Sequence, residues 1–302
     1  MKRPVFINPF YQERDTLLVA GSGRSGTTWL GNIIAQCPGF MTLFEPFDYR
    51  HVPELSVSSL RQYIRPDEKT HVLDKTISAV LRGKLRNEWM LSQNTRNLAW
   101  RILVKEIRAN LFLGYIQNRF NSKIIFVVRH PCAVVLSRME LKWETHLDDF
   151  LNQQELVEDY LTPYVDLIHN ANSEPVKHAV MWSIENMVPL VQMRQHHFIF
   201  CIYEDLIAKT DEELNRIFAL AGLKVPEKTH SLALQPASTS SSKKTVSGRK
   251  DYAGYWKTKL CKDDITSILD TVHTFGIDLY GDTTVPNHDS SWLRQDRENH
   301  AP

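Results

Sequence analysis

Residues 17–30 read Leu17-Leu18-Val19-Ala20-Gly21-Ser22-Gly23-Arg24-Ser25-Gly26-Thr27-Thr28-Trp29-Leu30. An apolar strand leads through a glycine-rich turn into a helix whose apolar residues recur at helical spacing. Such a turn can cradle a phosphate, because glycines let the backbone wrap closely and the helix N-terminus favours an anion. The turn and helix start also supply donors for phosphate oxygens, namely Arg24, Ser25, Thr27 and Thr28. These donors favour a phosphate site over a plain strand-to-helix turn.

The spacing from Gly21 to Gly26 also fits the P-loop pattern of nucleoside triphosphatases, G-x-x-x-x-G-K-[ST]. In this chain Thr27 stands where that pattern has its lysine. A kinase needs the lysine on the β- and γ-phosphates, so a P-loop kinase or NTPase is the less favoured alternative. The basic residue of this turn is instead Arg24, within the loop.

Strands and helices alternate along the rest of the chain. Apolar runs predict strands at residues 16–20, 40–44, 101–107, 123–128 and 198–203, and helices at 28–36, from Pro131 onward and at 211–221. Residues 54–95 are expected to be mostly helical, and 147–194 to form two helices broken near 172–175. The pattern predicts one domain over residues 1–302, a three-layer α/β/α fold with a mainly parallel sheet.

A second anion site is predicted where the apolar run 123–128 ends. Arg129 follows that run, and Ser137 lies two helical turns beyond Pro131. Ligands of open α/β sheets bind at the carboxyl ends of the strands, and arginine grips phosphate with two parallel hydrogen bonds. A surface ion pair at Arg129 is the structural alternative.

Together these motifs resemble the sulfotransferases that use 3′-phosphoadenosine 5′-phosphosulfate (PAPS). Gly23-Arg24-Ser25-Gly26-Thr27-Thr28-Trp29 is similar to their 5′-phosphosulfate loop, with arginine at residue 24 as is common in the carbohydrate branch. Arg129 and Ser137 match the family's 3′-phosphate site. The segment Tyr203-Glu204-Asp205-Leu206 matches a strand end that would put Tyr203 near the adenine.

The resemblance continues into a C-terminal lid. Residues 243–256 are similar to the family's basic lid, in which Arg249 would close over the 3′-phosphate. Asp251 stands where the cytosolic lid has glycine, which leaves a role for Lys250 open. A solvated basic loop is the alternative. We expect a mobile lid at about 235–257 and a frayed tail at about 283–302.

The chemistry of sulfuryl transfer calls for positioned cations and a base. Arg24 is the candidate for stabilising charge on the leaving phosphate, and Lys105, at the end of a strand, is expected to face the same space. The cytosolic branch takes its base from a K-x-H segment, but Ile107 replaces that histidine here. The carbohydrate branch tends to carry a glutamate-proline pair instead, which points to Glu45. A pocket with apolar walls would raise the pKa of that carboxyl.

His51 and Asp48, which are near Glu45 in the sequence, are the next candidates for the base. His130 and the pair His196-His197 are expected to be structural, and no ligand set predicts a metal. Residues 50–95 and 140–175 match no family motif and are expected to form the acceptor side. The acceptor would be a hydroxylated small molecule, sugar or glycolipid. A non-catalytic nucleotide-binding module is the remaining alternative.

The composition limits the class of protein. The 302 residues are 42% hydrophobic and 24% charged, which excludes a wholly disordered chain. Lys and Arg total 36 against 35 Asp and Glu, a net charge of +1, which argues against a nucleic-acid coat protein. Neither a signal peptide nor a membrane span is predicted. Four scattered cysteines suit reduced thiols, so a cytoplasmic location is expected.

Overall fold

The computed structural model describes residues 4–56, 58–193, 196–227, 229, 253–290 and 292. Its main sheet has the strand order β3-β5-β2-β6-β7, and every pair in it is parallel. The strands are β2 (Leu17–Gly21), β3 (Phe40–Phe44), β5 (Arg101–Glu106), β6 (Lys123–Val128) and β7 (Ile199–Ile202). The predicted parallel α/β fold is confirmed.

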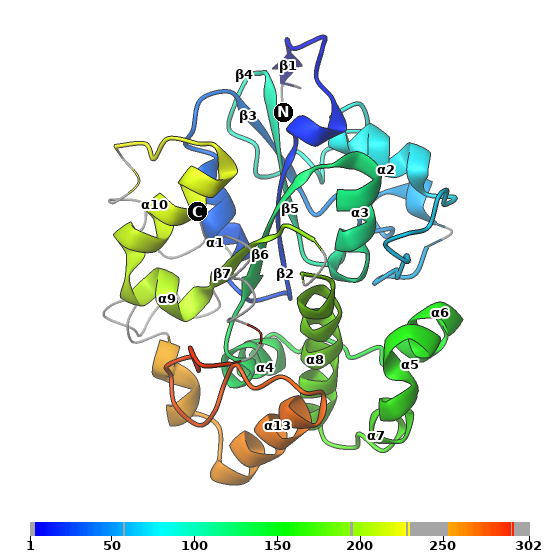
Figure 1. The fold of residues 1–302 in the computed structure, drawn as a ribbon, viewed down its shortest axis with the longest axis vertical. Helices are drawn as coiled ribbons and strands as arrows, with labels where there is room; N and C mark the ends of the chain where they lie inside the picture. Colours follow the sequence, from blue (N-terminus) through cyan, green and yellow to red (C-terminus); the bar gives the residue numbers. More distant parts are fainter. Residues whose placement is uncertain are drawn as a thin grey trace.

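Both faces of this sheet are covered, which explains its unbroken apolar strands. In β2, Leu17 and Val19 join one hydrophobic cluster, whereas Leu18 and Ala20 join the other. Figure 1 shows α1 (Thr27–Ile34), α9 (Tyr203–Ala208) and α10 (Thr210–Ala221) on one side, and α2 (Asp74–Leu81) and α3 (Leu113–Phe120) on the other. These are the three predicted layers.

A further group of helices lies beyond the carboxyl ends of the strands. It consists of α4 (Pro131–Glu140), α8 (Glu174–Met193) and α13 (Lys262–Thr274), which pack on one another (Figure 1). Because β2, β5 and β6 end facing this group, the loops that follow them meet between the sheet and the helices. Ligands of open α/β sheets bind at this edge.

Two predicted stretches differ from the structure. Within 54–95, the described residues contain one α-helix, α2, and a 3₁₀ turn at Pro53–Leu55. The apolar residues there, such as Leu60, Ile64 and Leu91, are buried by tertiary contacts without helical periodicity. The first helix predicted in 147–194 is a series of short pieces, α5 (Asp148–Leu151), α6 (Gln154–Leu156), a π-helical turn (Val157–Leu161), a 3₁₀ turn (Thr162–Tyr164) and α7 (Val165–His169).

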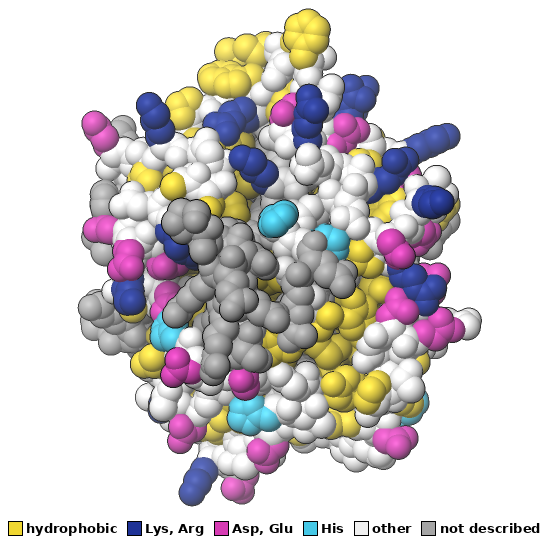
Figure 2. Space-filling model, viewed as in Figure 1, with side chains coloured by type: hydrophobic (Ala, Val, Ile, Leu, Met, Phe, Trp, Pro, Cys, Tyr) yellow, Lys and Arg dark blue, Asp and Glu magenta, His cyan; other side chains and the backbone are white. Residues whose placement is uncertain are grey.

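Short elements complete the described chain. β1 (Val5–Phe6) pairs in parallel with β4 (Leu98–Ala99), and 3₁₀ turns cover Glu13–Asp15, Asn110–Phe112 and Tyr255–Thr258. Figure 2 shows basic and acidic side chains interspersed over the described part of this face, with apolar ones gathered at the end that carries β1 and in a second patch right of and below the centre of the view. Within the described ranges, every helix is too short or too polar to cross a membrane.

Candidate active site

The glycine-rich turn forms a tight loop between β2 and α1. Gly26 caps α1 in the left-handed region (φ 92°), and Arg24, a non-glycine residue, also has positive φ (80°). A Cβ on Gly26 would lie 2.4 Å from the ring of Tyr203, and one on Gly23 would lie 2.7 Å from the ring of Trp143. The loop therefore needs glycine at both positions, because two aromatic rings pack directly on its backbone.

Arg24 and Arg129 meet on this loop, although they are far apart in the sequence. Arg24 Nε donates to Ser137 Oγ at 2.9 Å, and Arg129 Nη1 donates to the carbonyl of Arg24 at 3.0 Å. The guanidinium of Arg129 also lies 4.4 Å from the centre of the Tyr203 ring. Burial and the neighbouring guanidinia of Arg129 and Arg138 lower the pKa of Arg24. Crowded cations of this kind provide a binding place for anions.

The loop that carries Arg129 is fixed from two directions. Glu204, buried at the start of α9, accepts the backbone N–H of His130 at 3.0 Å and the hydroxyl of Tyr280 at 2.9 Å. His130 stacks on Trp256 with ring centres 4.4 Å apart. His130, which the sequence predicts to be structural, is packed between these elements, and Tyr203 begins a helix rather than ending a strand.

Glu45 lies directly after β3 in a left-handed conformation (φ 43°) that a non-glycine residue seldom adopts. Its Oε1 accepts from Lys105 Nζ at 2.6 Å and its Oε2 from Arg108 Nη1 at 2.5 Å. Glu45 is only 6% exposed and Lys105 only 4%. Strained backbone held by neighbouring contacts is typical of functional sites.

The expected raised pKa of Glu45 is wrong. Burial does raise it, but the charges of Lys105 and Arg108 outweigh burial and hold the pKa of Glu45 below its ordinary value. The sequence indicated the apolar walls but not the second cation, Arg108, which the loop after β5 brings to the carboxylate. Glu45 is therefore an anion at neutral pH.

Two buried glutamates that sequence reasoning missed hold the surrounding loops. Glu106 accepts the backbone N–H groups of Phe47, Ile107 and Arg108 at 2.7–2.8 Å, so it ties the loop after β3 to the loop after β5. Glu185, in the middle of α8, accepts from Ser22 Oγ at 2.7 Å and from Arg138 at 2.6 Å. Arg138 also donates to the carbonyl of Gly23, so α8 and α4 together brace the glycine-rich turn of residues 21–26, which we call the phosphate loop after its predicted ligand.

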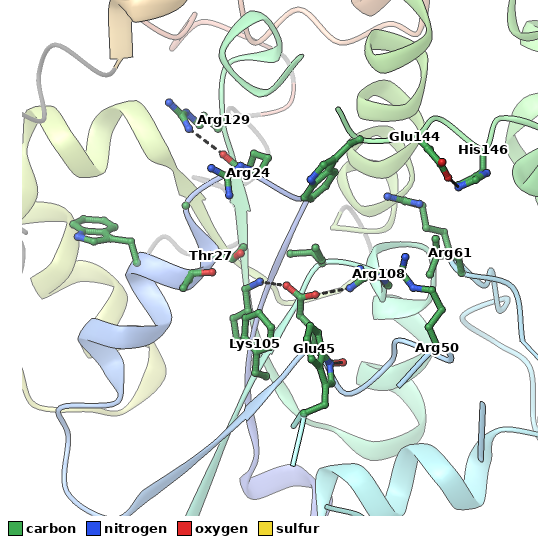
Figure 3. Close-up of a pocket in the computed structure, with 18 of the residues that line it drawn as sticks. Arg24, Thr27, Glu45, Arg50, Arg61, Lys105, Arg108, Arg129, Glu144 and His146 are labelled. Atoms are coloured by element: carbon green, nitrogen blue, oxygen red, sulfur yellow. Dashed lines mark hydrogen bonds and ion pairs between the residues drawn. The ribbon is translucent and has the colours of Figure 1, made fainter. Parts of the chain in front are cut away.

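A pocket of about 570 Å³ connects these groups. Figure 3 shows Arg24 and Arg129 on one side of it and Arg50, Arg61 and Arg108 on the other, with Glu45 and Lys105 between them. The remaining lining comes from the phosphate loop and α1 (Gly26, Thr27, Thr28, Trp29), from Tyr203, and from Phe44, Leu60, Trp89, Ile107, Lys142, Trp143, Glu144 and His146.

The structure thus brings together most residues that the sequence singled out. Gly23 and Ser25 belong to the same loop as the lining residues Arg24 and Gly26, and Ser137, on α4, reaches the site through its hydrogen bond with Arg24. Residues of segments 50–61 and 142–146 supply the opposite wall. His51 stacks on Trp89 at 3.9 Å, and Asp48 pairs with Arg50 and Arg108. Arg249, Lys250 and most of the expected lid and tail lie outside the described residues. Among residues that are described, His, Cys, Asp and Glu form no group suited to a metal ion.

The fold and site define an α/β protein with a glycine-rich loop and a pocket lined by arginines at the carboxyl edge of a parallel sheet. The chain belongs to the sulfotransferase family, since the family model described as "Sulfotransferase domain" matches residues 14–270. It is therefore a transferase of the sulfotransferase class. The P-loop kinase alternative is excluded by this match.

Several solved structures are similar to this chain. The sulfotransferase domain from the Synechococcus PCC 7002 olefin synthase has 19% identity and a TM-score of 0.49, covering 91% of this chain and 100% of that one. The sulfotransferase domain from the curacin biosynthetic pathway has 17% identity and a TM-score of 0.48, covering 88% and 98%. Mouse sulfotransferase SULT7A1 complexed with PAP has 14% identity and a TM-score of 0.45, covering 97% and 90%. A search of curated proteins by sequence finds no match.

Proposed function

We propose that this protein transfers a sulfuryl group from PAPS to a hydroxyl group of a small-molecule, sugar or glycolipid acceptor. The observation that supports the proposal is the meeting of two arginines, Arg24 and Arg129, beside a buried carboxylate in one pocket. PAPS carries two separate phosphate positions, and a hydroxyl acceptor needs a group that takes its proton. A cytoplasmic location remains a prediction from the cysteine pattern.

The residues present fit the nucleotide. Ser25 Oγ is buried in the loop with no hydrogen-bond partner among the described residues, so it awaits an acceptor such as a phosphosulfate oxygen. Gly23, Gly26, Thr27, Thr28 and Trp29 would form the cradle for the 5′-phosphosulfate. Arg129 and Ser137 would hold the 3′-phosphate, and Tyr203 would contact the adenine. Arg249 stays a sequence-based candidate for the same phosphate.

Arg24 would supply positive charge near the leaving phosphate and Lys105 near the sulfuryl group, where negative charge develops during the transfer. In the transfer, the acceptor O–H bond breaks and its proton passes to the Glu45 carboxylate as the new S–O bond forms. The bond between sulfur and the phosphate oxygen breaks, and that oxygen keeps the electron pair. A carboxylate of low pKa is a weak base, so engagement of Lys105 with the sulfuryl group would strengthen Glu45 by removing one of its two cations.

A transfer assay tests the proposal. The protein is incubated with PAPS carrying labelled sulfur and a panel of sugars, aliphatic alcohols and phenols, and products are identified by mass spectrometry as acceptor plus one sulfuryl group. We expect transfer to at least one alcohol class. PAP, the adenosine 3′,5′-bisphosphate that remains when PAPS gives up its sulfuryl group, is the matching ligand for binding assays. Binding of PAP without transfer to any member of a broad panel would favour the non-catalytic nucleotide-binding module instead.

A further inference from the structure

Arg61 lies on the pocket wall opposite the phosphate loop and is rigidly held. Its Nε donates to Glu185 Oε1, and its side chain is only 10% exposed. The other oxygen of Glu185 is fixed by Ser22 and Arg138. Although burial opposes its ionisation, the guanidinia of Arg138 and Arg61 lower the pKa of Glu185 to about 2, so this support stays charged.

The outer edge of the Arg61 guanidinium faces the pocket. Among the described residues no hydrogen bond is made by its Nη1 or Nη2, and neither atom is enclosed. Figure 3 shows this side chain beside Arg50 and Arg108, across Glu45 and Lys105 from Arg24. Two parallel N–H donors are thus presented to the pocket at a fixed position, which is the geometry that binds a carboxylate, sulfate or phosphate.

The buried ion-pair group behind Arg61 is not neutral. Glu185 contacts two cations, Arg61 and Arg138, so one positive charge of this group is not balanced within it. The other carboxylates nearby have their own partners: Glu45 contacts Lys105 and Arg108, Asp48 contacts Arg50 and Arg108, Glu106 accepts backbone N–H groups, and Glu144 contacts His146. Arg138 is fully buried, whereas Arg61 lines the pocket, so Arg61 is the member of this group that reaches a ligand there.

We infer that the acceptor carries an anionic group as well as its hydroxyl, and that Arg61 binds this group. The inference rests on the proposed function, since it assigns the far wall of the pocket to the acceptor. Leu60, Trp89 and Trp143 line the same pocket and supply apolar surface for the body of the acceptor. Acceptors of this class include uronic acids and sugars that already bear a sulfate or phosphate.

The test is a calorimetric titration of the protein saturated with PAP, so that the phosphate sites are filled. The probes are D-glucose, D-glucuronate, glucose 6-sulfate and glucose 6-phosphate, which share a hydroxylated ring and differ in their anionic group. We expect at least one anionic probe to bind tenfold or more tightly than glucose, and the identity of that probe names the group. Equal behaviour of all four probes, including no binding of any, overturns the inference.

Matched variants assign the effect to Arg61. Arg61→Gln should abolish the advantage of the anionic probe and Arg61→Lys should restore part of it, whereas Arg65→Gln should keep it fully. Arg65 is a suitable control because it is four residues away and pairs with Asp159 at the surface, outside the pocket. Arg61→Gln should fold, since Glu185 keeps Arg138 and Ser22.

Affinity for PAP separates the two proposals. It should be unchanged in all three variants, and a wild-type protein that does not bind PAP contradicts the proposed function itself. If PAP binds normally but the anionic advantage is absent, or persists in Arg61→Gln, only the assignment of Arg61 is overturned.

Discussion

Glu45 combines a strained backbone with two cationic partners, and these contacts hold its carboxylate in a fixed position. Positive φ at a non-glycine residue costs of order 1–3 kcal/mol, which surrounding contacts must offset. Here the backbone N–H of Glu45 donates to the carbonyl of Lys105 at 2.7 Å, and the carboxylate binds the Lys105 side chain as well. Lys105 therefore fixes both ends of Glu45.

Replacement of Glu45 by glutamine tests its role as the base. Glutamine keeps the size of the side chain but cannot accept the acceptor proton, so turnover should fall by about 10²–10⁴-fold. Affinity for PAP, measured by calorimetry, should stay near that of the wild type, because Arg24 and Arg129 lie on the other side of the pocket. Near-normal turnover would mean that another residue is the base, and Asp48 and His51 are the next candidates.

The ion pairs of Glu45 predict that the stability of the protein depends on pH, and the same variant tests this. Glu45 has a lowered pKa in the folded state, so its charge stabilises the fold above the ordinary carboxyl value of 4.5. That contribution is lost as the pH falls through the lowered folded pKa. In urea titrations, the wild type should exceed Glu45→Gln in free energy of unfolding near neutral pH, and the difference should shrink below pH 4.5. A difference that is constant with pH would show that the ion pairs contribute nothing.

Arg129→Ala tests the 3′-phosphate site. A hydrogen bond to a charged group contributes about 1.5–3 kcal/mol, so affinity for PAP should fall by roughly 10- to 100-fold. AMP, which has no 3′-phosphate, serves as the control ligand and should lose little affinity. Calorimetry that finds equal losses for PAP and AMP would mean that Arg129 acts by supporting the loop at Arg24, not by binding the 3′-phosphate.

At the level of elements, the buried strands were predictable because burial on both faces leaves an unbroken apolar run. β3 and β6 have the predicted bounds, and α10 ends at Gly222, whose φ of 71° explains the predicted stop. The stretch 54–95 was not predictable, because its apolar side chains are buried by the sheet and by neighbouring loops in an irregular backbone. Local periodicity cannot report such contacts.

Some residues of the candidate site could likewise be located from the sequence, and others could not. The loop residues 23–29 and Arg129 follow directly from strand ends, so local sequence locates them. Glu185 and Arg61 contact each other across 124 positions of the chain, and neither sits in a local motif. Glu185 in particular reads as an ordinary residue within a helix, and only the packing of α8 against the phosphate loop reveals its role.

Gly26→Ala tests how closely the phosphate loop and α9 are fitted. The new Cβ would force the Tyr203 ring away, so affinity for PAP should fall about tenfold, and left-handed backbone would cost about 1–2 kcal/mol of stability. Gly276→Ala is the matched control, because its φ of 76° brings similar strain while its Cβ would meet no atom within 4 Å. Thermal unfolding should show a loss for both variants, larger for Gly26→Ala because of the clash with Tyr203, and calorimetry should show weaker PAP binding only for Gly26→Ala. Equal PAP affinities would show that Tyr203 does not contact the nucleotide.

Across the whole molecule, separate parts of the core contact the loops beside the pocket. Trp29 belongs to the cluster on one face of the sheet, Trp182 to the cluster on the other, and Trp256 to the third cluster beside α4. Trp182 donates to the carbonyl of Arg129 at 3.1 Å, so the loop that carries Arg129 is tied to α8. A ligand bound here would hold these parts together.

This arrangement predicts which nucleotide stabilises the protein. PAP should bind at both Arg24 and Arg129, and at a concentration 100 times its dissociation constant it should add about 2.7 kcal/mol to the free energy of unfolding. ATP with magnesium should stabilise much less at the same concentration, because it has no 3′-phosphate for Arg129 and Thr27 replaces the lysine that grips its β- and γ-phosphates. Thermal shift measurements with each ligand check this, with AMP as the reference for binding without a 3′-phosphate. Equal shifts from PAP and ATP would contradict the two-phosphate site, and a larger shift from ATP would require a triphosphate site on the same loop.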